Sequence, residues 1–205
     1  MLLLLLRKDL FILRYYFLFV LLYLYLFGFM LYNYASFILV AALSAIMLMT
    51  FSATLDAKNK SMIVIASLPV SSKSIVQAKY AAVLLFALIG IVASVSVYAI
   101  NITIVGREMV YAASFIPIIF FIIAVYASLY YPIYYWFGFR ASQLVGMVAV
   151  ALPVTFLLAL GGVSSSANTL NFPAVGSTVL LAVSCLLLLV SYRLSLFFLD
   201  KKGVA

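Results

Sequence analysis

The sequence predicts an all-α membrane protein that crosses the bilayer six times and forms a single domain over residues 1–205. Hydrophobic residues make up 69% of the chain and charged residues only 8%, whereas a soluble domain carries about 25% charged residues. Six apolar stretches each approach the ~20 residues that a spanning helix needs. The fold is expected to be helical because a helix satisfies its own backbone groups in lipid.

The N-terminal segment Met1–Tyr15 is apolar but is interrupted by Arg7, Lys8, Asp9 and Arg14. Three cations in one short stretch do not suit a span, so we expect a helix in the cytoplasmic interface, with its cations reaching the headgroups. The segment has no small-residue cleavage site and continues into a full span. It is therefore expected to be retained, unlike a signal peptide.

The six predicted spans alternate with short polar connections. They lie at Tyr16–Tyr34, Ser36–Leu55, Lys79–Ile100, Ala112–Ile133, Ser142–Leu160 and Ala174–Tyr192. With these spans, eleven of the twelve Lys and Arg residues fall on one side and Arg107 alone on the other. Because basic residues favour the cytoplasmic side, we expect a multi-pass protein of the cell membrane with both termini in the cytoplasm. The same arrangement explains the net charge of +8 without nucleic acid as a partner.

The interiors of the six predicted spans lack Asp, Glu, Lys, Arg and His. Ion-coupled carriers usually keep such groups in the membrane, and a hydrolase needs a base to activate its nucleophile. No Gly-rich phosphate-binding loop is present. We therefore expect a chain without catalytic residues, metal site or bound cofactor, so that energy for uphill transport would come from a partner.

The connection from Asp56 to Lys79 is the candidate docking site for that partner. Asp56 is expected to cap a short helix over Ala57–Ala66, and Pro69 to end it by disfavouring helical geometry at the residue before it. Ser71 or Ser72 would then cap the next helix. A rigid helix in this place could transmit motion from a cytoplasmic motor into the second and third spans. On these residues alone, an amphipathic loop resting on lipid explains the pattern equally well.

Two sets of candidate functional residues follow. The residues expected to couple to the partner are Asp56, Lys58, Lys60, Met62, Ile63, Ala66, Ser67, Leu68 and Pro69. A substrate path without charges would use hydroxyl and amide side chains, with Tyr15, Tyr16, Tyr23, Asn33, Ser44, Thr50 and Ser52 as candidates. Such a path suits an amphipathic or lipid-like substrate better than an ion, although anchoring and packing are the simpler role for any one of these residues.

Small residues are spaced four apart on the third span, at Ala78 and Ala82 and again at Gly90 and Ser94. This spacing lets helices approach closely. Packing within one subunit is the simpler interpretation, and a contact between two copies is the alternative.

Two stretches resemble a known family. The segment Ser67-Leu-Pro-Val-Ser-Ser-Lys-Ser-Ile-Val-Gln-Ala-Lys-Tyr80 is similar to the connection between spans two and three of ABC-2 type exporter permeases, and Tyr131-Pro-Ile-Tyr-Tyr-Trp-Phe-Gly138 is similar to the end of their fourth span. Within that family, the chain length resembles the small permeases of phenol-soluble modulin exporters of Gram-positive bacteria. A single acid, Asp56, precedes the loop where family members often have more.

The resemblance implies two permease copies, identical or related, with two copies of a cytosolic ATPase that binds ATP and Mg²⁺. It also implies that the segment around 57–68 is the coupling helix and that the substrate is an amphipathic peptide pumped outward. The predicted function is therefore the membrane subunit of an ATP-driven exporter. The alternative is a membrane scaffold or channel-like protein that recruits a cytosolic partner without ATP.

Overall fold

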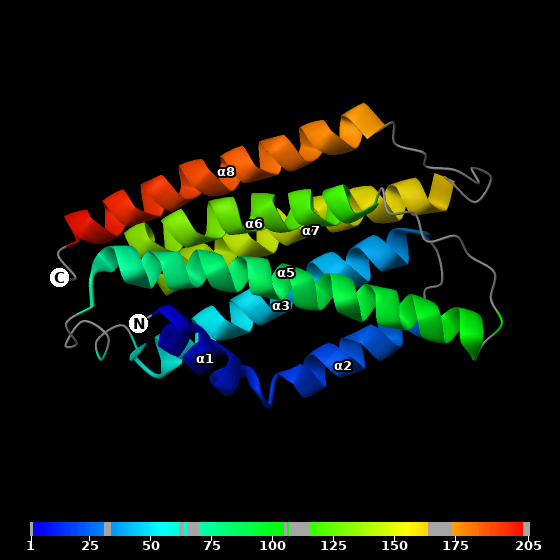
Figure 1. Ribbon diagram of the computed structural model, residues 1–205, viewed down its shortest axis with the longest axis horizontal. Helices are drawn as coiled ribbons and strands as arrows, with labels where there is room; N and C mark the ends of the chain where they lie inside the picture. The colour runs from blue at the N-terminus through cyan, green and yellow to red at the C-terminus, as the bar shows by residue number, and fades with distance from the viewer. Residues whose placement is uncertain are drawn as a thin grey trace.

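The computed structural model is a bundle of long helices (Figure 1). It describes residues 2–30, 34–61, 64, 70–104, 106, 115–163 and 174–202. Within these ranges, side chains are described except at 2–3, 29–30, 34–36, 152–154, 156–163 and 174–175. The start of α1 and the end of α8 lie toward the same end of the bundle, on the left of Figure 1. We call this end the termini end and the opposite end the far end.

The N-terminal segment forms two helices. Helix α1 is Leu2–Leu13 and helix α2 is Phe17–Tyr25, continued by the π-helix η1, Leu26–Met30. The axes of α1 and α2 differ by 59° across a short break. The sequence predicted this division between an N-terminal helix and a first span at Tyr15 and Tyr16. The placement of α1 in the membrane interface stays a prediction.

Helices α3 (Tyr34–Lys58) and α5 (Ser72–Thr103) pack antiparallel along the centre of the bundle. Ser71 is the N-cap of α5, and its hydroxyl accepts a hydrogen bond from the backbone N–H of Ser74 at 3.4 Å. This confirms the predicted serine cap. The cap starts α5 seven residues before the predicted span. With 32 residues α5 is about 48 Å long, longer than the ~30 Å hydrocarbon core of a bilayer.

Helices α6 (Phe115–Phe137), α7 (Phe139–Val163) and α8 (Ala174–Lys201) complete the bundle, and α6 packs against both α7 and α8. The chain reverses between α6 and α7 at Gly138, which has a φ of 88°. Only glycine adopts such a conformation without steric cost, so a single residue joins two antiparallel helices here.

Four helices of the described part are long and apolar enough to cross a membrane: α3, α5, α6 and α8. The bent pair of α1 and α2 would be a fifth. In α7 the apolar stretch with described side chains is Phe139–Ala151, while the helix itself runs on to Val163. The all-helical membrane architecture is confirmed, whereas the count of six spans stays a prediction.

The small residues of α5 lie inside this chain. Ala78, Ala82, Gly90 and Ser94 are all buried, and a Cβ added to Gly90 would clash with the backbone carbonyl oxygen of Ala41 on α3. The Ser94 hydroxyl donates to the Phe37 carbonyl at 3.1 Å. Gly90 and Ser94 therefore serve close packing of α3 and α5, and all four small residues are buried within one subunit, as the simpler interpretation predicted.

Candidate functional site

Four charged side chains form a closed ring at the termini end. The Lys79 ammonium lies 2.9 Å from Oδ2 of Asp9 and 2.5 Å from Oδ2 of Asp56. The Lys8 ammonium lies 3.1 Å from Oδ1 of Asp9 and 2.7 Å from Oδ1 of Asp56. Lys79 also donates to the Ser52 hydroxyl at 3.1 Å. We call Lys8, Asp9, Asp56, Lys79 and Ser52 the charge cluster.

The charge cluster is removed from solvent. The side chains of Asp9 and Asp56 are each 4% exposed, that of Lys79 11% and that of Lys8 27%. Taking ions out of water costs several kcal/mol per ion unless each is paired in good geometry. Here each carboxylate oxygen contacts one ammonium and each ammonium contacts both carboxylates. The ring is therefore neutral and internally satisfied.

Local helix geometry brings these residues together. Ser52 and Asp56 are four residues apart on α3, so they lie on one face. Asp9 and Leu13 have the same spacing on α1 and are both buried, while Leu4, Arg7 and Phe11 are exposed on its other side. Lys79 lies in the first turns of α5. These turns begin before the predicted span, because the serine cap starts the helix earlier than predicted. The cluster thus joins α1, α3 and α5.

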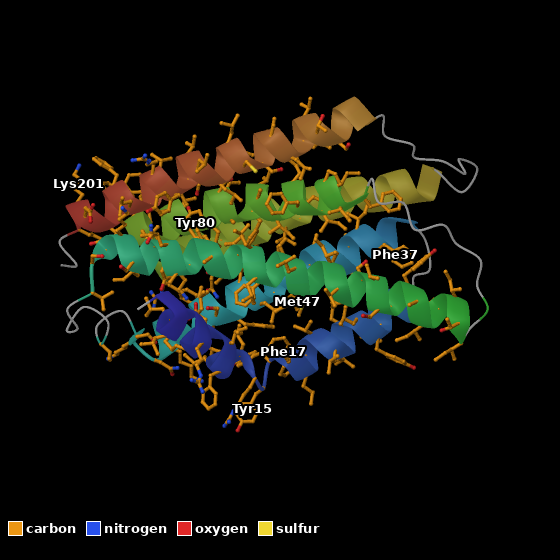
Figure 2. All side chains as sticks on the ribbon, in the orientation of Figure 1. Tyr15, Phe17, Phe37, Met47, Tyr80 and Lys201 are labelled. Atoms are coloured by element: carbon orange, nitrogen blue, oxygen red, sulfur yellow. The ribbon has the colours of Figure 1, made fainter. Side chains whose placement is uncertain are left out.

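A second polar contact lies on the other side of α5 (Tyr80 is labelled in Figure 2). The Tyr80 hydroxyl is 2.5 Å from Oγ of Ser191 and 2.9 Å from Oγ of Ser195, both on α8. Ser191 in turn donates to the Ser128 carbonyl of α6 at 3.1 Å. Adjacent residues of α5 therefore connect it to α1 and α3 on one side and to α6 and α8 on the other.

The structure changes the role of Asp56. We predicted that it caps a new helix beginning at Ala57, but α3 continues to Lys58 and the Asp56 carboxylate points into the charge cluster. That prediction is wrong because pairing with two buried lysines satisfies the carboxylate inside α3. Lys58 and Lys60 are exposed as predicted, and Lys60 lies in a turn with a φ of 50°. Met62, Ile63, Ala66, Ser67, Leu68 and Pro69 lie outside the described residues.

The predicted substrate-path residues within the described part of the chain lie in several different surroundings. Tyr15 is 70% exposed and points away from the bundle at the α1–α2 break (Figure 2), while the Tyr23 hydroxyl donates to the Leu39 carbonyl at 3.0 Å. Ser44 is buried and donates to the Ala41 carbonyl, and Ser52 belongs to the charge cluster. Tyr16 packs against the Phe51 ring, and Asn33 lies outside the described residues.

Thr50 lines a cavity. This cavity has a volume of about 440 Å³ and lies between α3, α6 and α7. Its walls are mostly apolar, and its polar groups come from Thr50, Tyr126 and Gln143. The Thr50 and Tyr126 hydroxyl oxygens are 3.5 Å apart. Apolar walls with a few convergent polar groups are typical of small-molecule sites, so this cavity is the candidate for substrate contact.

A larger groove, with a volume of about 590 Å³, separates α2 from α5. Leu21 and Leu24 line it from α2, and Leu88, Val92 and Ser96 line it from α5. The sequence does not predict this groove. Hydropathy shows that both helices are apolar, but it does not show the bend before Phe17 that separates α2 from α5.

The described residues contain no group of three or more His, Cys, Asp or Glu that could hold a metal ion. The family model described as "ABC-2 family transporter protein" matches residues 4–199. The match covers all residues of the charge cluster and both hollows. Comparisons with curated proteins and with solved structures gave no match.

Proposed function

This chain belongs to the ABC-2 family of transporter proteins, and on that premise we propose that it exports amphipathic peptides from a Gram-positive cell. Membership makes it a multi-pass membrane permease of an ABC transporter whose ATPase is a separate partner subunit. The proposal adds the peptide cargo and the similarity to phenol-soluble modulin exporters. It also adds a dimer of permeases, each crossing the membrane six times as one domain.

The observation that carries the coupling part of the proposal is the charge cluster. Asp56 precedes the 57–68 segment and Lys79 follows it, so an ion pair of 2.5 Å holds the two flanks of that segment together. A segment with fixed flanks can act as a rigid contact for an ATPase. In this proposal Lys58, Lys60 and the 62–69 residues meet the ATPase, which binds ATP and Mg²⁺ and pushes on the segment as it closes.

The exposed cations support the proposed orientation of the protein in the membrane. Helix α1 and the last turns of α3 and α8 lie toward the termini end (Figure 1), and they carry the exposed cations Arg7, Lys58, Arg193 and Lys201, with Lys60 just after α3. Because basic residues favour the cytoplasmic side of a membrane, the termini end faces the cytoplasm in our proposal. This places the 57–68 segment where a cytosolic ATPase can reach it.

The peptide cargo is supported by the character of the two hollows. Both are lined mainly by apolar side chains of membrane helices, and the α3–α6–α7 cavity adds a few hydroxyl and amide groups. Such surfaces suit a molecule with one apolar and one polar face. Thr50 is the substrate-path residue with the best support, since its side chain lines that cavity.

Purification of the tagged chain from its native membrane in mild detergent, followed by mass spectrometry, tests the proposal first. A stoichiometric ABC ATPase is expected, and the complex in proteoliposomes should move amphipathic helical peptides when ATP is added. A Leu68→Lys, Pro69→Gly double variant should keep ATP hydrolysis and lose peptide movement. Purification with a partner that binds no nucleotide would instead support the scaffold alternative.

A further inference from the structure

We infer that the charge cluster makes α1 part of the coupling apparatus and passes motion of the 57–68 segment through α1 to α2. The responding element is the α2–α5 groove, which changes its width as α2 tilts. This inference rests on the proposed function, because it requires an ATPase that acts on the segment.

The first step is the joint between α1 and the two flanks of the segment. Asp56 lies two residues before the end of α3, and Lys79 is the eighth residue of α5. Lys8 and Asp9 of α1 contact both of them. In a buried site of low dielectric, separating these charges is costly. Any movement of the α3 and α5 ends therefore carries α1 with it.

An ion-binding role for the cluster is less consistent with its geometry. All four carboxylate oxygens already contact an ammonium group. A further cation would have to displace a lysine, and the ring is neutral without one. The ring is also made of two neutral halves, Lys8 with Asp9 on α1 and Asp56 with Lys79 on α3 and α5. This composition suits a contact that holds α1 against the packed pair of helices α3 and α5.

The second step is the connection from α1 to α2. The two helices meet at 59° through a hydrogen-bonded turn, in which the Tyr16 N–H donates to the Leu13 carbonyl at 2.8 Å and the Val20 N–H to the Tyr16 carbonyl at 3.2 Å. Leu13 itself is buried in the core. Because the turn keeps backbone hydrogen bonds on both sides of the break, a change in the direction of α1 changes the direction of α2.

The third step is the freedom of α2 against α5. The groove between them is lined mainly by apolar side chains, while α2 is held to α3 by the hydrogen bond from the Tyr23 hydroxyl to the Leu39 carbonyl. Beyond the groove, the Asn101 amide of α5 donates to the Gly28 carbonyl of η1 at 3.3 Å. The α1–α2–η1 unit is thus tied to α5 at both ends and to α3 through Tyr23, and the groove lies between α2 and α5. Motion at the α1 end would tilt α2 about the Asn101–Gly28 contact.

The test removes only the α1 half of the ring. A Lys8→Met, Asp9→Asn variant leaves the Asp56–Lys79 pair intact, so every remaining charge in the cluster keeps a partner. Spin labels at Leu22→Cys on α2 and Val95→Cys on α5, in a Cys185→Ser background, report the width of the groove. Distances are measured in the reconstituted complex with its ATPase, without nucleotide and after trapping with ATP and vanadate.

With the native charge cluster, the label distance should differ between the two states. In the Lys8→Met, Asp9→Asn variant the difference should disappear, and the amount of peptide moved per ATP should fall about tenfold, the size of a typical coupling between two sites. An Arg193→Met variant, which removes an exposed cation at the same end, should behave as the native chain. A nucleotide-dependent distance change that persists without Lys8 and Asp9 would overturn the inference.

Two further outcomes separate the inference from the proposed function. If the native complex moves peptide with ATP but the label distance never changes, the function stands and the inference is wrong. If the native complex moves no peptide, the proposed function fails whatever the labels show. Should the double variant fold poorly, a fully neutral cluster (Lys8→Met, Asp9→Asn, Asp56→Asn, Lys79→Met) replaces it, because removing all charges together leaves none unpaired.

Discussion

The two ends of the bundle are held together by different chemistry. At the termini end, side chains bond to other side chains across helices: the charge cluster joins α1, α3 and α5, and the Tyr80 hydroxyl joins α5 to α8. Toward the far end, single side chains bond to backbone carbonyls, as Ser94 does to Phe37 and Asn101 to Gly28. The groove between α2 and α5 separates these helices over part of their length.

This difference indicates which part of the permease is rigid and which part can move. Buried ionic contacts are costly to break singly, whereas apolar helix surfaces in lipid can shift without losing hydrogen bonds. The termini end is therefore suited to receive a force and transmit it unchanged. The region around the groove is suited to respond. Between them, α3 and α5 pack closely at Gly90, where an added Cβ would clash with the Ala41 carbonyl oxygen.

The largest effect should come from a single break in the charge cluster. Lys79→Met leaves the two buried carboxylates with Lys8 as their shared partner, and removing one member of a buried ionic group costs about 3–5 kcal/mol. The expected result is a strong loss of folded protein, measured as thermal unfolding of the detergent-purified chain. An Arg193→Met variant, which removes an exposed cation, should unfold like the native chain. Equal stability of the two variants would show that the termini end is not held by charge.

The contact at Gly90 should be the next most sensitive. In Gly90→Ala the new methyl group meets the Ala41 carbonyl oxygen, so α3 and α5 must move apart. Overpacking of this kind costs about 1–3 kcal/mol. Thermal unfolding measures the loss, and Ser96→Ala on the exposed side of the same helix provides the comparison. A Gly90→Ala variant as stable as Ser96→Ala would mean that the two helices are not closely packed there.

The hydroxyl contacts of Tyr80 should contribute less. Tyr80→Phe removes the bonds to Ser191 and Ser195 but keeps the ring, and interhelical hydrogen bonds in membranes are worth about 0.6 kcal/mol on average. Thermal unfolding in the same detergent should show a small decrease in stability. Tyr192→Phe is the matched control, since its hydroxyl makes no hydrogen bond within the described part of the chain. If Tyr192→Phe lost more thermal stability than Tyr80→Phe, the hydroxyl contacts of Tyr80 would not be stabilising the bundle.

The sequence predicted most of the helices but not how they are tied together. The α1–α2 break, the serine cap of α5 and the small-residue packing follow from local patterns, which single residues such as Ser71 and Gly90 determine. The charge cluster does not, because its contacts join residues 70 and 23 positions apart and no pattern of spacing indicates such pairs. We read Asp56 as a cap and Lys79 as the mouth of a span. Each is plausible in isolation, and only their proximity in space makes them partners.

The smallest effect on stability, and the most informative about the groove, should come from filling it. Ala93 lines the groove from α5, so Ala93→Leu places an apolar side chain in open space. Stability should change by no more than about 0.5 kcal/mol, as for most substitutions that disturb no packed contact. If the groove must narrow during the transport cycle, the ATP-driven peptide movement of the proposed function should nevertheless fall several-fold. Ala99→Leu on the same helix is exposed and does not line the groove, so it should leave peptide movement unchanged. If the two variants transported equally well, the groove would not need to change its width during transport. The division of the bundle into a rigid termini end and a moving groove region would then be wrong.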